Sequence, residues 1–176
     1  PDRFLEEAEA VLRLDFAKAN DPRALELINK TNQFNLNGRR LSEGEWRARL
    51  ADPATFLVVA AYEDKYGPLG KIAVILGRAA DGRVAVDAWV MSCRAFGRRI
   101  EHRCLEQLFA RFGADEIAFD FQPTPRNGPL QEFFAALLGG SPGAGLTLSR
   151  TLFTDRCPPL YHQVVMGWTP GLPAED

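Results

Sequence analysis

The chain has 176 residues, of which 46% are hydrophobic and 25% are charged, and its formal net charge is −2. This size and composition predict one globular domain with a hydrophobic core of its own. The nearly balanced charge leaves no basic surface of the kind that binds nucleic acid or an anionic membrane, and the longest apolar runs are too short to span a bilayer.

Three cysteines, Cys93, Cys104 and Cys157, form an odd set without the spacing of a metal site. We therefore expect reduced thiols, a cytoplasmic location and no bound metal. The acidic start, residues 1–9, is not followed by the apolar core of a signal peptide. The first residue is not methionine, which indicates either a segment cut from a longer polypeptide or a trimmed chain.

Capping signals and hydrophobic periodicity predict alternating helices and strands along the chain. Asp21-Pro22 predicts a helix start, because Asp is a preferred N-cap and Pro fits the first helical turn. Ser42 and Glu45 have the spacing of a capping box. In chain order, the expected elements are an acidic lead-in helix, a strand (11–16), a helix from residue 22, a polar run (29–35), a helix ending at 50, strands (55–62, 70–76 and 83–91), a helix (101–112), a strand (117–121), a helix (130–138) and two weaker strands (146–148 and 161–166).

This order of elements predicts a mixed α/β domain of the α+β kind. We expect a lead-in helix and first strand over residues 1–20 and the main domain over residues 21–167. Residues 168–176 are rich in proline and are expected to form a loose tail.

The most informative stretch is 89–102, where a short apolar strand leads into a basic, glycine-bearing turn and then into an amphipathic helix. Cys93 lies at the strand end, directly before Arg94. A helix N-terminus and flanking arginines lower the pKa of a cysteine, and the thiolate is the nucleophilic form. Cys93 is therefore a candidate catalytic nucleophile. The alternative is a small buried thiol beside a solvated basic turn.

The two histidines are candidates for proton transfer. His102 follows Cys93 by nine residues and would take a proton from a thiol if the turn returned its imidazole toward Cys93. A capping or solvent-facing role is the alternative for His102. His162, on the last expected strand, is a second candidate. Cys104 is expected in the core, on the apolar face of a helix, and Cys157 is expected to take no part.

Four segments resemble the acyltransferase-like half of the FkbH family, and the resemblance extends over about residues 21–167. They are Leu27-Ile-Asn-Lys-Thr-Asn-Gln-Phe-Asn-Leu36, Tyr66-Gly67, Val90-Met-Ser-Cys-Arg94 with Gly97-Arg98, and Pro123-Thr-Pro-Arg-Asn-Gly128. That half of the family resembles a GNAT (Gcn5-related acyltransferase) fold. The resemblance implies a central, mostly antiparallel sheet that is flanked by helices.

The resemblance also implies an acyltransferase of polyketide assembly. A glyceryl group would pass from 1,3-bisphosphoglycerate to a Cys93 thioester, and then to the phosphopantetheine thiol of an acyl carrier protein. The carrier would be the partner and would supply the phosphopantetheine, so that no tightly bound cofactor is expected. In the family a haloacid-dehalogenase-like phosphatase half usually precedes this one. The chain has no Asp-x-Asp-type phosphatase motif, which makes a separate phosphatase domain a further expected partner.

Arg94, Gly97 and Arg98 are similar to part of the pyrophosphate loop of coenzyme A acetyltransferases, where small residues let backbone N–H groups close on the pyrophosphate at a helix start. Arg99 stands where that loop has a small residue, which argues against ordinary acetyl-coenzyme A as the donor. A phosphorylated donor or a phosphopantetheine would still bind the arginines. The alternative is a solvated basic helix start.

Asn32, Gln33 and Asn35 are candidate substrate-binding residues, because neutral amides recognise hydroxyls and carbonyl oxygens without adding charge. They fit a glyceryl unit or a pantetheine arm, and the alternative is that they hold an irregular turn. Thr124 and Asn127 lie at a strand-to-helix loop where pantetheine passes in the related acyltransferases. Asn127 is equally a candidate helix N-cap.

Two other functions stay open at this point. One is GNAT-type transfer from an acyl-coenzyme A to an amine, in which Cys93 would be inert. The other is a non-catalytic module that docks on a carrier protein.

Overall fold

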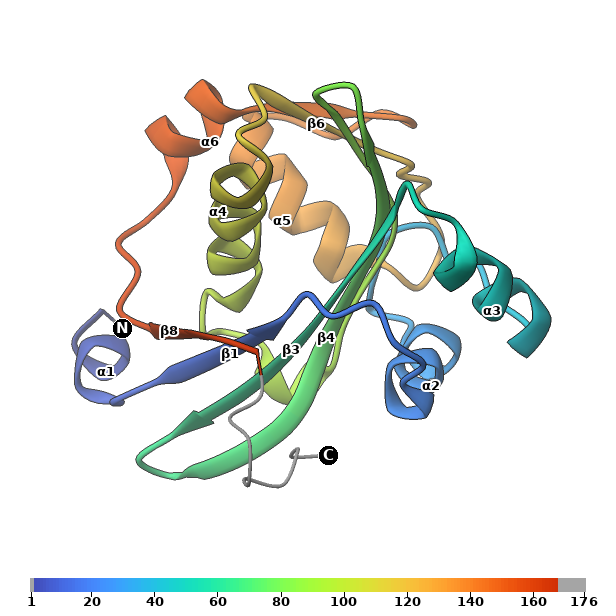
Figure 1. The fold of residues 1–176 in the computed structure, drawn as a ribbon. Coiled ribbons are helices and arrows are strands. Elements are labelled where there is room, and N and C mark those ends of the chain that lie inside the picture. Colours follow the sequence, from blue (N-terminus) through green and yellow to red (C-terminus); the bar gives the residue numbers. More distant parts are fainter. Residues whose placement is uncertain (1, 168–176) are drawn as a thin grey trace.

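The computed structural model describes residues 2–167, in which one mixed sheet lies between two layers of helices (Figure 1). In chain order the elements are α1 (Asp2–Glu7), β1 (Val11–Asp15), α2 (Pro22–Lys30), β2 (Phe34–Asn35), α3 (Glu43–Ala51), β3 (Thr55–Asp64), β4 (Gly67–Ala80), β5 (Arg83–Met91), a 3₁₀ turn η1 (Cys93–Ala95), α4 (Ile100–Phe112), β6 (Glu116–Phe119), α5 (Gly128–Leu138), β7 (Thr147–Ser149), α6 (Arg150–Arg156) and β8 (Gln163–Met166).

The strands form a single sheet in the order β7-β6-β5-β4-β3-β1-β8, and β2 pairs with β5 outside this path. The pairs β1–β3, β3–β4, β4–β5, β2–β5 and β6–β7 are antiparallel, whereas β1–β8 and β5–β6 are parallel. The expected α/β fold with a mostly antiparallel central sheet is therefore confirmed. The tail expected over residues 168–176 lies outside the described residues.

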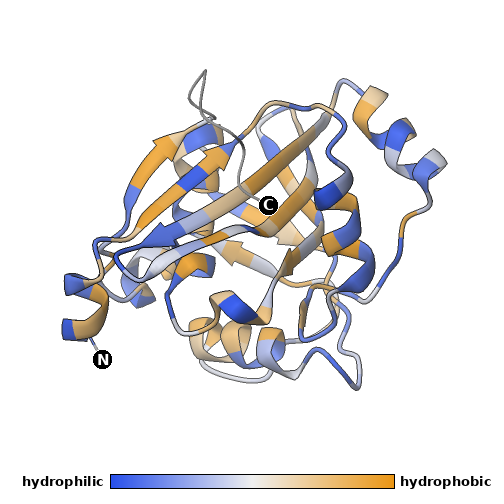
Figure 2. Ribbon diagram, turned by 90° about the horizontal axis from the view of Figure 1, so that it is seen from below, coloured by the Kyte–Doolittle hydropathy of each residue, from blue (hydrophilic) through white to orange (hydrophobic). Residues whose placement is uncertain are grey.

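Each face of the sheet has its own hydrophobic core. Side chains of β3 alternate between them, as a strand requires: Leu57 packs under α2 and α3, and Phe56 packs on the opposite face. The α2–α3 core includes Trp46, whereas the larger core under α4, α5 and α6 is built around Trp89 and Phe134. Figure 2 shows the matching pattern, with hydrophobic and hydrophilic bands on the helices.

The structure departs from the predicted elements where pairing is non-local. The predicted strand 70–76 is longer, because β4 pairs with β3 along one edge and with β5 along the other. The two-residue strand β2 is hidden within the polar run 29–35. Helix α6 was not predicted, although Ser149 caps it by accepting a hydrogen bond from the backbone N of Leu152 at 3.1 Å. The predicted last strand starts two residues later, at Gln163.

Gly77 lies at a register shift where β4 approaches β5 closely. A Cβ at this position would lie 2.3 Å from the backbone oxygen of Ala85 and 2.7 Å from the ring of Phe56. We expect Gly77→Ala to lower the free energy of unfolding by about 2 kcal/mol, because the backbone of β5 must shift. Chemical denaturation measures the loss. Gly143→Ala is the control, since a Cβ there meets nothing within 4 Å, and an equal loss in both variants would contradict the argument.

Candidate functional site

Cys93 is the first residue of η1, directly after β5, and its side chain is exposed. The turn is anchored to the sheet, because the backbone N of Ser92 donates to the oxygen of Ile72 in β4 at 2.7 Å. The hydroxyl of Ser92 also accepts a hydrogen bond from the backbone N of Arg94 at 3.4 Å. A fixed turn therefore presents the Cys93 thiol to solvent, and its interpretation as a small buried cysteine is wrong.

The other two cysteines are free but less accessible. Cys104 is 2% exposed, and burial raises the pKa of its thiol to about 12, so that it lies in the core as predicted. Cys157 is half-buried, and burial raises the pKa of its thiol as well. Its Sγ donates to the backbone oxygen of Pro158 at 3.3 Å. Cys93 is thus the most accessible nucleophilic thiol of the three.

The loop between η1 and α4 turns through two left-handed residues, Gly97 with φ 80° and Arg99 with φ 57°. Such a conformation is easy for glycine and costly for a side-chain-bearing residue. Two hydrogen bonds of the Arg99 guanidinium offset the cost of this backbone conformation. They go to the oxygen of Pro159 at 2.9 Å and to Oδ1 of Asp2 at 2.6 Å. Arg99 makes no side-chain cap on α4. Its guanidinium therefore joins α1 to the segment between α6 and β8.

The two predicted phosphate-binding arginines point in different directions. Arg94 is exposed, and it lines an open hollow of about 470 Å³ together with Pro22, Arg23 and Glu26 of α2. Arg98 instead folds back on its own loop, where Nη1 donates to the oxygen of Arg94 at 2.8 Å. The structure therefore leaves Arg94 available to a ligand, whereas Arg98 is bound within the protein.

His102 lies on the first turn of α4, with its side chain 18% exposed. Its ring packs edge-on against Phe133, with ring centres 4.9 Å apart, and its Nδ1 lies 3.4 Å from Oε1 of Glu101. Within residues 2–167, no hydrogen bond joins His102 to Cys93. The ring of His102 is therefore not directed to solvent, and it makes no hydrogen bond to the thiol. Proton transfer by His102 stays a prediction.

His162 lies under the loop that follows Cys93. The residue is 8% exposed, and its Nε2 is 2.7 Å from the backbone oxygen of Arg98. Burial, more than any other effect, lowers the pKa of His162 below its ordinary value. Its imidazole therefore binds the backbone of the loop at Arg98.

The predicted amide residues lie in and around a short segment that is placed between the diverging ends of β5 and β6. Strands β5 and β6 pair only from Val84 to Val86 and then separate. Residues 34–37, the inserted segment, enter this gap: Asn35 pairs with Val90 of β5, and the backbone N of Leu36 donates to the oxygen of Trp89 at 3.0 Å. On the other side, the backbone N of Gln122 donates to the oxygen of Leu36 at 3.1 Å. The segment thus bridges the two diverging strands.

Asn127 locks the inserted segment in place. Its side chain is fully buried, and its Nδ2 donates to the oxygens of Asn35 at 2.9 Å and Gln122 at 3.0 Å. Its Oδ1 accepts from the backbone N of Thr124 at 2.8 Å and from Nε2 of Gln131 at 2.7 Å. Asn127 stands at the N-cap of α5 but makes no side-chain cap on it. Its hydrogen-bonding groups are engaged inside the protein.

The remaining predicted residues divide between interior and surface. Asn35 is 3% exposed, and its Oδ1 accepts from the backbone N of Gly38 at 2.7 Å. Asn32 accepts from Nη2 of Arg40 at 2.5 Å, and Gln33 is exposed. Thr124 is half-buried, and its Oγ1 accepts from the backbone N of Asn127 at 3.1 Å. These bonds match the alternative in which the amides hold an irregular turn, and a contact with substrate stays a prediction.

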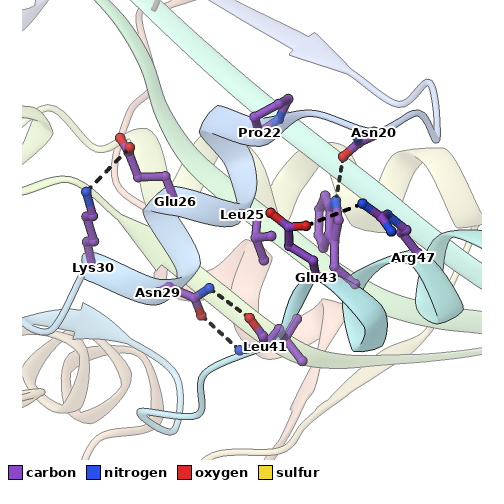
Figure 3. A pocket seen from close by; sticks show the side chains of 10 residues that line it. Asn20, Pro22, Leu25, Glu26, Asn29, Lys30, Leu41, Glu43 and Arg47 are labelled. Carbon is purple, nitrogen blue, oxygen red and sulfur yellow. Dashed lines mark hydrogen bonds and ion pairs between the residues drawn. The ribbon is translucent and has the colours of Figure 1, made fainter.

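A second hollow, of about 350 Å³, lies between α2 and α3 (Figure 3). Its lining includes the apolar side chains of Leu25, Leu41 and Trp46. The ion pairs Glu26–Lys30 (3.5 Å) and Glu43–Arg47 (3.3 Å) stand on the two helices. It shares Pro22 and Glu26 with the hollow beside Arg94. Sequence reasoning missed both hollows, because the outward residues of α2 have the pattern of an ordinary solvated face.

The described residues contain neither a cluster of metal ligands nor a helix that could span a membrane. Across residues 2–167, no three His, Cys, Asp or Glu side chains are grouped so as to hold a metal ion. Over the same residues, no helix has the length and hydrophobicity that crossing a membrane requires.

The arrangement of strands and helices is similar to that of known acetyltransferases. A crystal structure of aminoglycoside acetyltransferase AAC(6')-Ib in complex with coenzyme A aligns with 83% of this chain and 98% of its own, with a TM-score of 0.50 and 14% identity. The chain has a GNAT acetyltransferase fold. The ribosomal-protein-S18-alanine N-acetyltransferase of Escherichia coli aligns with 72% of this chain and 76% of its own, with a TM-score of 0.48 and 8% identity. No protein-family model and no curated protein sequence matches the chain.

Proposed function

We propose that the chain is an acyltransferase that works through a thioester on Cys93. The observation that carries this proposal is the exposed thiol in the fixed turn at the end of β5, within a GNAT fold. Following the FkbH resemblance, we propose 1,3-bisphosphoglycerate as the donor. The acceptor would be the phosphopantetheine thiol of an acyl carrier protein in polyketide assembly.

The proposed chemistry has two steps. In the first, the Cys93 thiolate attacks the acyl carbon of the acyl phosphate, the bond from that carbon to the bridging oxygen breaks, and inorganic phosphate leaves with the electron pair. In the second, the pantetheine thiol gives its proton to solvent and attacks the acyl carbon of the thioester, and the bond from that carbon to Sγ breaks, so that Cys93 leaves as the thiolate. An acyl phosphate is already activated, so a positioned thiolate is sufficient as the nucleophile for the first step.

The hollow beside Arg94 supports a phosphorylated donor. Arg94 and Arg23 line it from two different elements, and Cys93 directly precedes Arg94 in the chain. A guanidinium matches the geometry and charge of a phosphate better than an ammonium does. Arg23 pairs with Glu26 in the structure, and a partly exposed pair within one helix costs little to rearrange. We propose that Arg94 binds the phosphate of the donor.

The inserted segment restricts the path of a pantetheine arm, which coenzyme A and a holo carrier protein have in common. The resemblance places a passing pantetheine at the loop of Thr124 and Asn127. In this chain, residues 34–37 occupy the gap next to that loop, and Asn127 is fully buried against them. A pantetheine arm, of coenzyme A or of a carrier protein, would have to displace this segment to follow that path, so we expect the arm of the carrier to approach the exposed Cys93 from another side.

Incubation of the whole chain with enzymatically generated 1,3-bisphosphoglycerate tests the proposal by intact-protein mass spectrometry. We expect a glyceryl or phosphoglyceryl adduct that moves to a holo carrier protein and stays on the chain with the apo carrier, which lacks the pantetheine thiol. A retained phosphate would indicate that a separate phosphatase domain removes it. Acetyl-coenzyme A is expected to give no adduct.

Other results would favour the two alternatives. Carrier binding without a labelled cysteine would indicate a docking module. Acetylation of an added amine by acetyl-coenzyme A, with Cys93 unmodified, would indicate a direct N-acyltransferase.

A further inference from the structure

The turn that carries Cys93 rests on a polar cluster of four side chains: Tyr62, Asp64, Arg98 and His162. Arg98 connects the cluster to the turn, because its Nη1 donates to the backbone oxygens of Arg94 at 2.8 Å and Phe96 at 3.2 Å. These two carbonyls lie within three residues of Cys93 in the chain. One guanidinium therefore closes the loop that follows the thiol.

The cluster holds Arg98 from the side of β3. The guanidinium carbon lies 5.6 Å from the centre of the Tyr62 ring, and its Nε is 4.0 Å from Oδ2 of Asp64. The hydroxyl of Tyr62 donates to the same carboxylate oxygen at 2.8 Å. The side chain of Asp64 is 5% exposed, so this pairing is shielded from solvent. Arg98 is thus fixed at one end by the sheet and at the other by its own loop.

His162 fixes the same residue from β8 through the backbone. Its Nε2 lies 2.7 Å from the oxygen of Arg98, and since a carbonyl oxygen only accepts, Nε2 must carry the hydrogen. In the neutral ring Nδ1 then has no hydrogen. Nδ1 is buried and has no hydrogen-bond partner among the described residues. A proton there would be a buried donor without an acceptor, so the site fits the neutral imidazole.

Charged groups on several elements face His162. They are Arg98 and Arg99 of the loop, Glu101, Arg103 and Glu106 of α4, and Asp64 of β3, which acts through Tyr62. Arg103 also donates to the backbone oxygen of His162 at 2.8 Å. The cavity between the ring, Arg98 and Arg99 is only about 10 Å³, so that a reoriented imidazolium has almost no space. Protonation of His162 keeps the Nε2–H donor but buries a charge and an Nδ1–H without an acceptor, so it is expected to destabilise the closed loop relative to an open one in which the imidazolium is solvated.

We propose that Arg98 and His162 are positioning residues, which hold the Cys93 turn in the geometry for acyl transfer as long as His162 is neutral. The inference rests on the proposed function of Cys93. It also changes the role that the sequence suggested for Arg98, from binding the substrate to holding the loop. The bond from neutral His162 and the two bonds from Arg98 act on the same few residues, so that loss of either is expected to loosen the turn.

The test uses the full chain with Cys157→Ser, so that Cys93 is the accessible thiol. His162→Leu removes the donor to the loop, whereas His162→Gln keeps a side-chain N–H and does not titrate. Arg98→Met removes the guanidinium. Arg111→Met is its matched control, because Arg111 also stacks on a ring, that of Phe16 at 4.6 Å, but at the other end of α4.

Three quantities are measured for each variant: amide-exchange protection of residues 93–99, the rate of acyl transfer from Cys93 to the carrier, and the rate of Cys93 alkylation by iodoacetamide. For His162→Leu and Arg98→Met we expect about tenfold less protection and about tenfold slower transfer, because a small displacement of the nucleophile is costly. Alkylation should change less than about twofold, since this small reagent needs no positioned substrate. His162→Gln and Arg111→Met should resemble the parent at pH 7.

The dependence on pH separates positioning from simple stability. In the parent, protection of residues 93–99 should fall as the pH drops below the ordinary imidazole pKa of about 6.5, because the open loop then binds a proton that the closed loop, in which burial lowers the pKa of His162, does not. In His162→Gln it should stay constant over the same range. Equal pH profiles of parent and His162→Gln would overturn the inference, as would unchanged protection and transfer in His162→Leu.

The remaining outcomes are also decisive. A parallel loss of transfer, alkylation and melting temperature in every variant would mean a structural role only, and would overturn the inference. If His162→Leu does not fold, the profile of His162→Gln decides. If no donor acylates the parent, the proposed function fails. Amide exchange of residues 93–99 then still tests whether Arg98 and His162 hold the turn.

Discussion

Cys93→Ala should abolish the acyl adduct on the chain and slow carrier loading by at least about a thousandfold, because the thiolate is the group that would form the covalent bond. The remaining thiols cannot replace it: Cys104 is 2% exposed with a pKa near 12, and Cys157 is half-buried with a raised pKa. Intact-protein mass spectrometry detects the adduct, and a radiolabelled acyl group measures the rate of loading.

Two further variants show whether the loss is specific. Cys157→Ala should load the carrier within about twofold of the parent rate, since Cys157 packs against the edge of the core and its thiol donates to its neighbour Pro158. Cys93→Ser should acquire the acyl group slowly and retain it, because a hydroxyl is the weaker nucleophile and an oxygen ester exchanges poorly with a thiol. Carrier loading at the parent rate by Cys93→Ala would contradict the covalent mechanism and indicate direct transfer.

The position of Cys93 at the end of a strand could be read from the chain because it depends on local structure, whereas its exposure could not, and a buried thiol stayed open until the structure was known. An apolar strand must end where the basic, glycine-bearing turn begins, and the residue at that junction leaves the sheet. The structure places Met91 in β5 at 1% exposure and Cys93, two residues later, in solvent. The same local logic correctly predicted the helix start at Pro22, with Asp21 accepting from the backbone N of Arg23.

The directions of the long side chains could not be read in this way. Arg94 and Arg98 lie in one basic run, which favoured a common phosphate-binding role. The structure instead directs Arg98 toward Tyr62 and the neighbouring Arg99 toward Asp2, partners that are distant in the chain and that only the folded sheet brings within reach. A pattern of neighbouring residues contains no information about such partners. The same reason explains why the two-residue strand β2 was missed, since its pairing with β5 is entirely non-local.

Asn127→Ala should lower the free energy of unfolding by about 3 kcal/mol, the largest stability loss that we expect for an amide in this chain. The substitution leaves the oxygens of Asn35 and Gln122 without their donor and the backbone N of Thr124 without its acceptor, around a side chain that is fully buried. Chemical denaturation measures the loss. Gln33→Ala, at an exposed position of the preceding turn, should cost less than about 0.5 kcal/mol.

The same variant distinguishes the structural role of Asn127 from the substrate contact that the sequence suggested. If Asn127 holds the inserted segment, Asn127→Ala should increase amide exchange of residues 34–37 and of Gln122, because their bridge between β5 and the end of β6 depends on its Nδ2. If Asn127 instead contacts the pantetheine arm, the KM for the carrier should rise while stability and exchange stay at the parent values. The four hydrogen bonds that already occupy its amide favour the first outcome, because a contact with substrate would require breaking at least one of them in the bound state.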